Sequence, residues 1–287
     1  MQASTPEPTS SSKTASSTAC AQDEQEKSTD TSLLAEDDVI EETLEGGRKV
    51  RRRGIYLLPN LLTTSALFSG FYAIVAAMHG EFANAAAAIF VAMVFDGLDG
   101  RVARLTNTQS AFGEQYDSLA DMVSFGVAPA LVAFSWILGD LGKTGWVAAF
   151  VYVAGAALRL ARFNVQIGAV DKRWFIGLPS PAAAALIAGM VWTLNDFDLN
   201  ALAFKMLAVL TVAGAGLLMV SGIRYYSFKD LDLKGRVPFV MLLAIVLAFV
   251  IVSLSPATVL LLFFFGYALS GPARLIWRWR QHQKKSA

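Results

Sequence analysis

Eight long apolar stretches make a membrane-spanning helical fold the expected architecture of this chain. They occupy residues 56–78, 83–104, 117–138, 145–165, 181–194, 201–223, 237–254 and 256–276. Most approach the roughly 20 residues with which a helix crosses a bilayer. The fifth stretch is short, and only Ser255 and Pro256 separate the last two, so six to eight spans fit and we prefer eight. The sequence therefore predicts an all-α, polytopic transmembrane helix bundle of about eight spans.

The first part of the chain has a different character. Residues 1–47 are rich in Ser, Thr, Glu, Asp and Gln and nearly free of aromatic residues. Such a segment buries too little apolar surface to offset the entropy lost on ordering. We expect a disordered cytoplasmic tail over residues 1–47 and a transmembrane domain over residues 48–287. The domain opens with a basic collar of Arg48, Lys49, Arg51, Arg52 and Arg53.

Lysine and arginine positions predict the orientation in the membrane, because cytoplasmic loops carry an excess of both residues. With eight spans and the collar inside, the loops and flanks on the cytoplasmic side hold most of the cations. These are Arg101, Arg104, Arg159, Arg162, Lys172, Arg173, Arg224, Lys229, Lys234, Arg236, Arg274, Arg278, Arg280, Lys284 and Lys285. Only Lys143 and Lys205 stand on the other side. The chain is expected to be a multi-pass protein of the cytoplasmic membrane.

Composition excludes several classes of site and partner. The single cysteine, Cys20, permits neither an intramolecular disulfide nor a cysteine metal cluster. No apolar run precedes Cys20, so a lipoprotein signal is not expected. The net charge of +1 averages an acidic front segment and a basic remainder, and no nucleic-acid partner is predicted.

Two pairs of aspartates stand at the junction of the second and third apolar stretches. Asp96 and Asp99 are three residues apart, and Asp117 and Asp121 are four apart. On a helix each spacing places the pair on one face. If the two spans are neighbours in an antiparallel hairpin, all four carboxylates share a small volume.

A divalent cation would relieve the repulsion among these carboxylates, because buried like charges are costly near a membrane. All-oxygen ligation favours Mg²⁺ or Mn²⁺ and, less well, Ca²⁺, whereas the lack of a Cys or His cluster disfavours zinc. Two ions about 3.5–4 Å apart would form a clamp suited to displacement at phosphorus. In the alternative interpretation the aspartates cap helices and pair with Arg101 and Arg104 in a loop.

The spacing D-x2-D-G-x2-A-R-x8-G-x3-D-x3-D resembles the signature of the CDP-alcohol phosphatidyltransferase family. The matching residues are Asp96, Asp99, Gly100, Ala103, Arg104, Gly113, Asp117 and Asp121. The resemblance implies that Asp96, Asp99 and Asp117 are the primary metal ligands. Asp121 is then a further ligand or the base that deprotonates the acceptor alcohol. The resemblance also implies six core spans around a cytoplasm-facing polar cavity and a homodimer, with a cytidine and diphosphate pocket lined by Gly100, Ala103, Arg104 and Gly113.

Softer matches through most of residues 54–275 resemble one branch of that family, the membrane-integral phosphatidylserine synthases. They are Leu57–Thr63, Asp121–Pro129, Leu158–Asn164, Gly177–Pro181 and Tyr226–Lys229. Arg159 and Arg162 can hold the carboxylate of a serine acceptor, since guanidinium groups bind carboxylates bidentately. Asn164 follows at the same helix end. Alternatively, the two arginines are positive-inside topology signals.

The expected reaction is attack of the L-serine hydroxyl on the lipid-bearing phosphorus of CDP-diacylglycerol, which yields phosphatidylserine and CMP. Another acceptor, such as glycerol 3-phosphate or inositol phosphate, is the nearest alternative. A divalent-cation transporter and a lipid phosphatase are alternatives of other classes. A transporter spreads polar residues across the bilayer, whereas here they gather at cytoplasmic helix ends.

Overall fold

The computed structural model describes residues 42–45, 48–51, 57–106, 110–165, 174–197, 201–226 and 252–286, together with residues 243, 247 and 250. The chain divides into two units, residues 1–53 and residues 54–287. All helices named below belong to the second unit.

The first unit contains a β-hairpin. Strand β1 (Glu42–Glu45) pairs antiparallel with β2 (Arg48–Arg51), so that Glu42 stands opposite Arg51 and Glu45 opposite Arg48. Residues 42–45 thus form a strand within the predicted tail, and the disorder of residues 1–47 stays a prediction. Residues 1–41, 46 and 47 lie outside the described residues.

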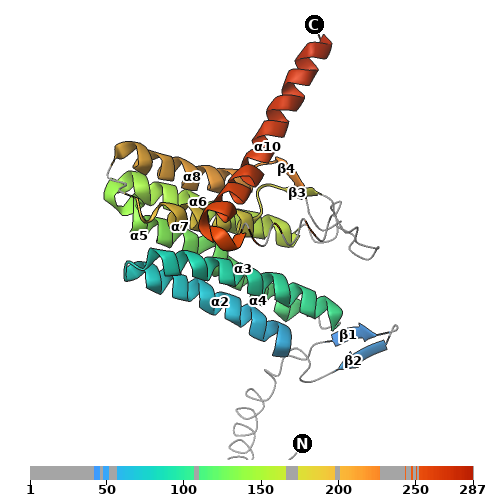
Figure 1. Ribbon diagram of the computed structural model, residues 1–287. Coiled ribbons are helices and arrows are strands. Elements are labelled where there is room, and N and C mark those ends of the chain that lie inside the picture. The colour runs from blue at the N-terminus through green and yellow to red at the C-terminus, as the bar shows by residue number, and fades with distance from the viewer. Residues whose placement is uncertain are drawn as a thin grey trace, which may run out of the picture. The chain divides into compact units, whose positions relative to one another are not determined.

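The second unit is built from helices, and the prediction of an all-α helical bundle is confirmed. The helices are α2 (Leu57–Met78), α3 (Phe82–Leu105), α4 (Ala111–Asp121), α5 (Ala128–Trp136), α6 (Lys143–Val165), α7 (Ser180–Leu194), α8 (Leu202–Val220) and α10 (Pro256–Ser286) (Figure 1). A π-helical segment, η1 (Met122–Val127), joins α4 to α5, and a 3-10 turn, η2 (Leu138–Leu141), precedes α6. The short strands β3 (Trp174–Ile176) and β4 (Arg224–Tyr226), which the sequence did not predict, pair antiparallel.

Six segments in the described part of the chain are long and apolar enough to cross a membrane. They are Leu57–Met78, Phe82–Leu105, Phe112–Trp136, Lys143–Val165, Leu202–Val220 and Pro256–Leu275. Each overlaps one predicted span. The predicted fifth span corresponds to α7, whose 15 residues reach about 22 Å, less than the roughly 30 Å of a hydrocarbon core. The predicted seventh span, 237–254, lies mostly outside the described residues, so the total of eight stays a prediction.

Helix α7 is enclosed by its neighbours. Eleven of its residues are buried, and it packs against α3, α5, α8 and α10. Its alanine-rich sequence is apolar on every side, as expected for a helix in the interior of a bundle. Because protein rather than lipid covers α7, this helix does not have to be long enough to cross the membrane.

Glycines permit a close approach between α6 and α8. A Cβ atom on Gly155 of α6 would lie 2.4 Å from the carbonyl oxygen of Gly216 on α8. A Cβ on Gly216 would in turn lie 2.7 Å from the Cα of Tyr152. Small residues at such contacts let helix backbones pack directly against each other within a membrane.

Tyr152 joins α6 to the π-helical segment. Its hydroxyl donates a 2.8 Å hydrogen bond to the carbonyl of Phe125. In an α-helix that carbonyl would accept from residue 129, but Pro129 has no N–H group. Tyr152 is fully buried. It thereby supplies a donor where the backbone lacks one, just beyond Asp121.

Tyr225 joins strand β4 to α10 in the same way. Its buried hydroxyl donates a 3.0 Å hydrogen bond to the carbonyl of Ala268, which Pro272 leaves without its α-helical donor. Burial raises the pKa of Tyr225 to about 12, so the hydroxyl keeps the proton that it donates. Gly271 makes room for the ring, since a Cβ there would lie 2.4 Å from it.

Candidate active site

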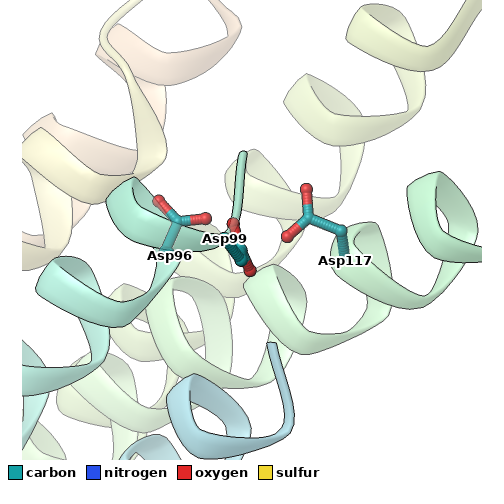
Figure 2. Close-up of side chains that lie close together, drawn as sticks. All are labelled: Asp96, Asp99 and Asp117. Carbon is teal, nitrogen blue, oxygen red and sulfur yellow. The ribbon is translucent and has the colours of Figure 1, made fainter. Parts of the chain in front are cut away.

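Three carboxylates come together where α3 ends and α4 begins. Asp96 and Asp99 lie near the end of α3, and Asp117 lies on α4. One oxygen from each carboxylate lies within 4.8 Å of the others. Figure 2 shows the three side chains projecting toward one another from the two helices. The structure thus brings together three of the four predicted ligands, and their oxygens form a donor set suited to a hard divalent cation.

Helix α4 begins before the third predicted span. The Ser110 hydroxyl accepts a 2.9 Å hydrogen bond from the backbone N–H of Gly113, which caps the helix at Ala111. Gly113 and Asp117 therefore lie one turn apart on one helix face. A Cβ on Gly113 would lie only 3.0 Å from the Ser110 hydroxyl oxygen and 3.5 Å from Oδ1 of Asn60. The apolar pattern missed this first part of the helix because it is polar.

A cavity of about 290 Å³ lies beside the carboxylates. Residues of α2, α3 and α4 and the capping serine line it. They are Pro59, Asn60, Thr63, Asp99, Gly100, Ala103, Arg104, Ser110, Gly113, Glu114 and Asp117. All four residues that the family resemblance assigned to a nucleotide pocket are included. Helices α3 and α4 both pack against α2, so the walls come from three helices, where the sequence predicted a hairpin of two.

Arg104 is held at the edge of this cavity by its own helix. Its Nε donates a 2.7 Å hydrogen bond to the carbonyl of Gly100, one turn earlier. The guanidinium group brings a delocalised positive charge to the cavity, and its two terminal nitrogens can donate to an anion there.

Several lining residues were not predicted as site residues. Asn60 and Thr63 come from α2, and Ser110 and Glu114 come from the start of α4. The hydroxyl of Thr63 donates a 2.8 Å hydrogen bond to Oδ2 of Asp99. Their sequence signal is weak, because polar residues near the end of an apolar helix are common at membrane interfaces.

Asp121 is a neighbour of the cluster of three but not one of its members. Its carboxyl group interacts electrostatically with those of Asp96 and Asp117 and with the guanidinium group of Arg159 on α6. The Arg159 guanidinium donates a 2.8 Å hydrogen bond from Nη1 to the hydroxyl of Ser180 at the start of α7. Asp121 therefore lies between the aspartate cluster and a cation.

The three residues predicted to bind serine have separate partners. Nη1 of Arg162 donates to the carbonyl of Val220 on α8 at 3.2 Å, and Asn164 exchanges hydrogen bonds with Ser118 on α4. Of the three, only Arg159 interacts with an aspartate of the signature. Its Nε is buried and has no hydrogen-bond partner among the described residues.

The polar residues of the site are confined to one end of the helices. They lie at the start of α2, the end of α3 and the start of α4. A transport pathway requires polar groups along the depth of the bilayer. This arrangement favours an enzyme at the membrane surface over a transporter.

Comparison with known proteins agrees with the site. The family model for CDP-alcohol phosphatidyltransferase matches residues 56–220, which include every residue of the eight-point signature. The chain belongs to this family. As a CDP-alcohol phosphatidyltransferase with six apolar helices long enough to cross a bilayer, it is a multi-pass membrane protein.

Similar proteins are found in bacteria and archaea. The chain is 39% identical over 222 residues to the CDP-diacylglycerol–serine O-phosphatidyltransferase of Helicobacter pylori strain J99, covering 77% of this chain and 92% of that protein. It is 33% identical over 213 residues to the protein of the same name from Mycobacterium leprae, covering 72% and 71%. The Methanocaldococcus jannaschii protein of that name is 35% identical over 178 residues, covering 62% and 78%.

Proposed function

We propose that this phosphatidyltransferase joins the phosphatidyl group of CDP-diacylglycerol to the hydroxyl of L-serine, forming phosphatidylserine and releasing CMP. The observation that carries the proposal is the cluster of Asp96, Asp99 and Asp117 beside a cavity lined by the signature residues Gly100, Ala103, Arg104 and Gly113. The names of the similar proteins support serine as the acceptor.

The donor set fits Mg²⁺ or Mn²⁺, because carboxylate oxygens from two helices approach one another and no sulfur or imidazole ligand joins them among the described residues. Asp96, Asp99 and Asp117 would hold the metal, with Asp121 as a further ligand if two ions bind. When bound, divalent ions neutralise the diphosphate and stabilise CMP as the leaving group.

The cavity would hold the cytidine diphosphate part of the lipid substrate. Gly100, Ala103 and Gly113 keep its walls free of large side chains, and Arg104 adds a positive charge. The diacylglycerol chains would remain in the membrane beside α2 and α3, whose outward faces are apolar.

Asp121 is the proposed general base. It would take the proton of the serine hydroxyl as the hydroxyl oxygen forms a bond to the lipid-bearing phosphorus and the bond from that phosphorus to the CMP oxygen breaks. Its place between Asp96 and Arg159 supports this role, since an acceptor held by Arg159 would lie next to Asp121.

Arg159 is the strongest candidate to hold the serine carboxylate. It is partly buried and anchored by Ser180, and its Nε is a donor without a partner in the described residues. A buried N–H group without a partner costs free energy, and a hydrogen bond to a carboxylate would remove that cost. Arg162 and Asn164 would complete the acceptor site from the end of the same helix.

We also propose that the site faces the cytoplasm and that the protein forms a homodimer. The lysine and arginine distribution supports the orientation. The family resemblance supports the dimer.

The test is CMP release by the purified protein supplied with CDP-diacylglycerol, Mn²⁺ or Mg²⁺ and one acceptor at a time. We expect release with L-serine, none after chelation with EDTA, and recovery when the metal is restored. Release with glycerol 3-phosphate or an inositol phosphate instead of serine would overturn the acceptor assignment. Release in the presence of excess EDTA would overturn the metal assignment.

A further inference from the structure

A hydroxyl from outside the family signature touches the aspartate cluster. Thr63 lies on α2, whereas the clustered aspartates lie on α3 and α4. Its Oγ1 lies 2.8 Å from Oδ2 of Asp99 and 3.1 Å from the carbonyl oxygen of Pro59. Thr63 is 4% exposed and Asp99 is 5% exposed, so little water competes for either group.

The hydroxyl carries one proton and can satisfy only one acceptor fully. The Pro59 carbonyl is a neutral acceptor in the same helix, whereas Asp99 offers a carboxylate. Hydrogen bonds to ionised groups are roughly twice as strong as neutral ones. The proton therefore points to Oδ2 of Asp99, and this hydrogen bond restrains the orientation of the carboxylate.

A neighbouring threonine makes the matching contact to the other helix of the site. Thr64 shares a 2.9 Å hydrogen bond with the hydroxyl of Tyr116 on α4. The hydroxyl oxygen of each threonine also lies within hydrogen-bond distance of the carbonyl oxygen four residues earlier in α2. They differ in one respect that matters here, because Thr63 contacts a clustered aspartate and Thr64 does not.

We propose that Thr63 is a positioning residue that orients Asp99 for metal binding. The inference rests on the proposed metal dependence of phosphatidyl transfer. Partners that orient metal ligands are worth about tenfold to a hundredfold in metal affinity. Through Thr63, helix α2 would support a metal site whose ligands come from α3 and α4.

The experiment measures Mn²⁺ binding to the purified, substrate-free protein by the loss of the free-ion electron paramagnetic resonance signal. Thr63→Val keeps the shape of the side chain and removes the hydroxyl, and Thr63→Ala removes it without requiring a second methyl group to fit. We expect both to raise the Mn²⁺ dissociation constant about tenfold to a hundredfold. Thr63→Ser keeps the donor and is expected to stay within about threefold of wild type.

Thr64→Val is the matched control, because it loses a hydroxyl from the next position of the same helix. Its Mn²⁺ affinity should remain within about threefold of wild type. Wild-type Mn²⁺ affinity in either Thr63→Val or Thr63→Ala would overturn the proposal, as would an equal loss in Thr64→Val. If the Thr63 variants lose Mn²⁺ affinity but the wild-type protein releases no CMP with serine, the proposed acceptor is wrong and the role of Thr63 stands.

Discussion

At the scale of single residues, the aspartates of the signature differ in their surroundings. Asp99 is almost fully buried and receives the Thr63 hydroxyl, whereas Asp96 and Asp117 retain more exposure. Asp121 interacts electrostatically with Asp96, Asp117 and Arg159. These contacts link all four carboxylates, so the removal of one disturbs the others.

We expect Asp96→Ala, Asp99→Ala, Asp117→Ala and Asp121→Ala each to lower CMP release by on the order of 10³-fold or more, because groups that act as a unit are strongly non-additive. The variants should remain inserted in the membrane. Asp140→Ala is the control, since Asp140 forms an exposed ion pair with Lys205 at 2.7 Å and lies outside the site. Near wild-type turnover of Asp96→Ala in saturating metal would contradict the assignment.

A second prediction at this scale concerns the acceptor. Arg159→Ala should raise the KM for serine about tenfold to a hundredfold, the effect of losing one charged hydrogen bond of roughly 1.5–3 kcal/mol. The KM for CDP-diacylglycerol should change much less. Arg159→Lys should recover only part of the loss, because a point charge does not reproduce the planar fork.

Steady-state kinetics with each substrate varied in turn separate the possibilities. An equal rise in both KM values would place Arg159 on the diphosphate. If neither Arg159→Ala nor Arg162→Ala changed either KM, the two arginines would only mark the cytoplasmic side of the membrane.

At the scale of helices and strands, buried tyrosines compensate for prolines. Tyr152→Phe and Tyr225→Phe each remove the donor to a helix carbonyl whose α-helical partner is a proline. A buried polar group left unsatisfied costs about 1–3 kcal/mol. We expect each variant to lower the free energy of unfolding in detergent by about this amount.

Chemical denaturation of the purified variants provides the measurement. Tyr72→Phe is the comparison, since Tyr72 is 44% exposed on the outer face of α2. A loss for Tyr72→Phe as large as that for Tyr225→Phe would contradict the explanation.

The contact between α6 and α8 gives another prediction for these elements. Gly216→Ala should separate the two helices and lower thermal stability, because the added Cβ would meet backbone atoms of Val151 and Tyr152 at 2.7–3.0 Å. Gly214→Ala on the same helix should be neutral or slightly stabilising, since its Cβ position lies within 4 Å of no other helix or strand among the described residues and alanine favours helix. Equal melting temperatures for the two variants would show that the contact is not needed.

At the scale of the whole molecule, the residues of the candidate site belong to only one of the two units. Every residue of the signature and every residue that lines the cavity lies in the unit of residues 54–287. Deletion of residues 2–41, which keeps the β1–β2 hairpin, should leave most of the specific activity in detergent. CMP release per milligram of purified protein measures this. A loss of most of that activity would assign the first segment a part in catalysis.

The sequence by itself was enough to predict the membrane-spanning helices, the family membership and the grouping of the signature aspartates. Apolar stretches of sufficient length predict helices because a bilayer offers backbone groups no other partner. Eight residues at fixed spacing predict the signature because helical periodicity places them on common faces. Both predictions are independent of how the helices pack against one another.

Tertiary structure alone decided which helices meet and what else reaches the site. The contacts of Thr63 with Asp99 and of Arg159 with Ser180 join residues 36 and 21 positions apart, and no local pattern encodes them. The enclosure of α7, the π-helical segment after Asp121 and the proline-compensating tyrosines likewise depend on packing between distant segments. Sequence periodicity reports which face of a helix is apolar, whereas only the packed bundle determines the partner that the face contacts.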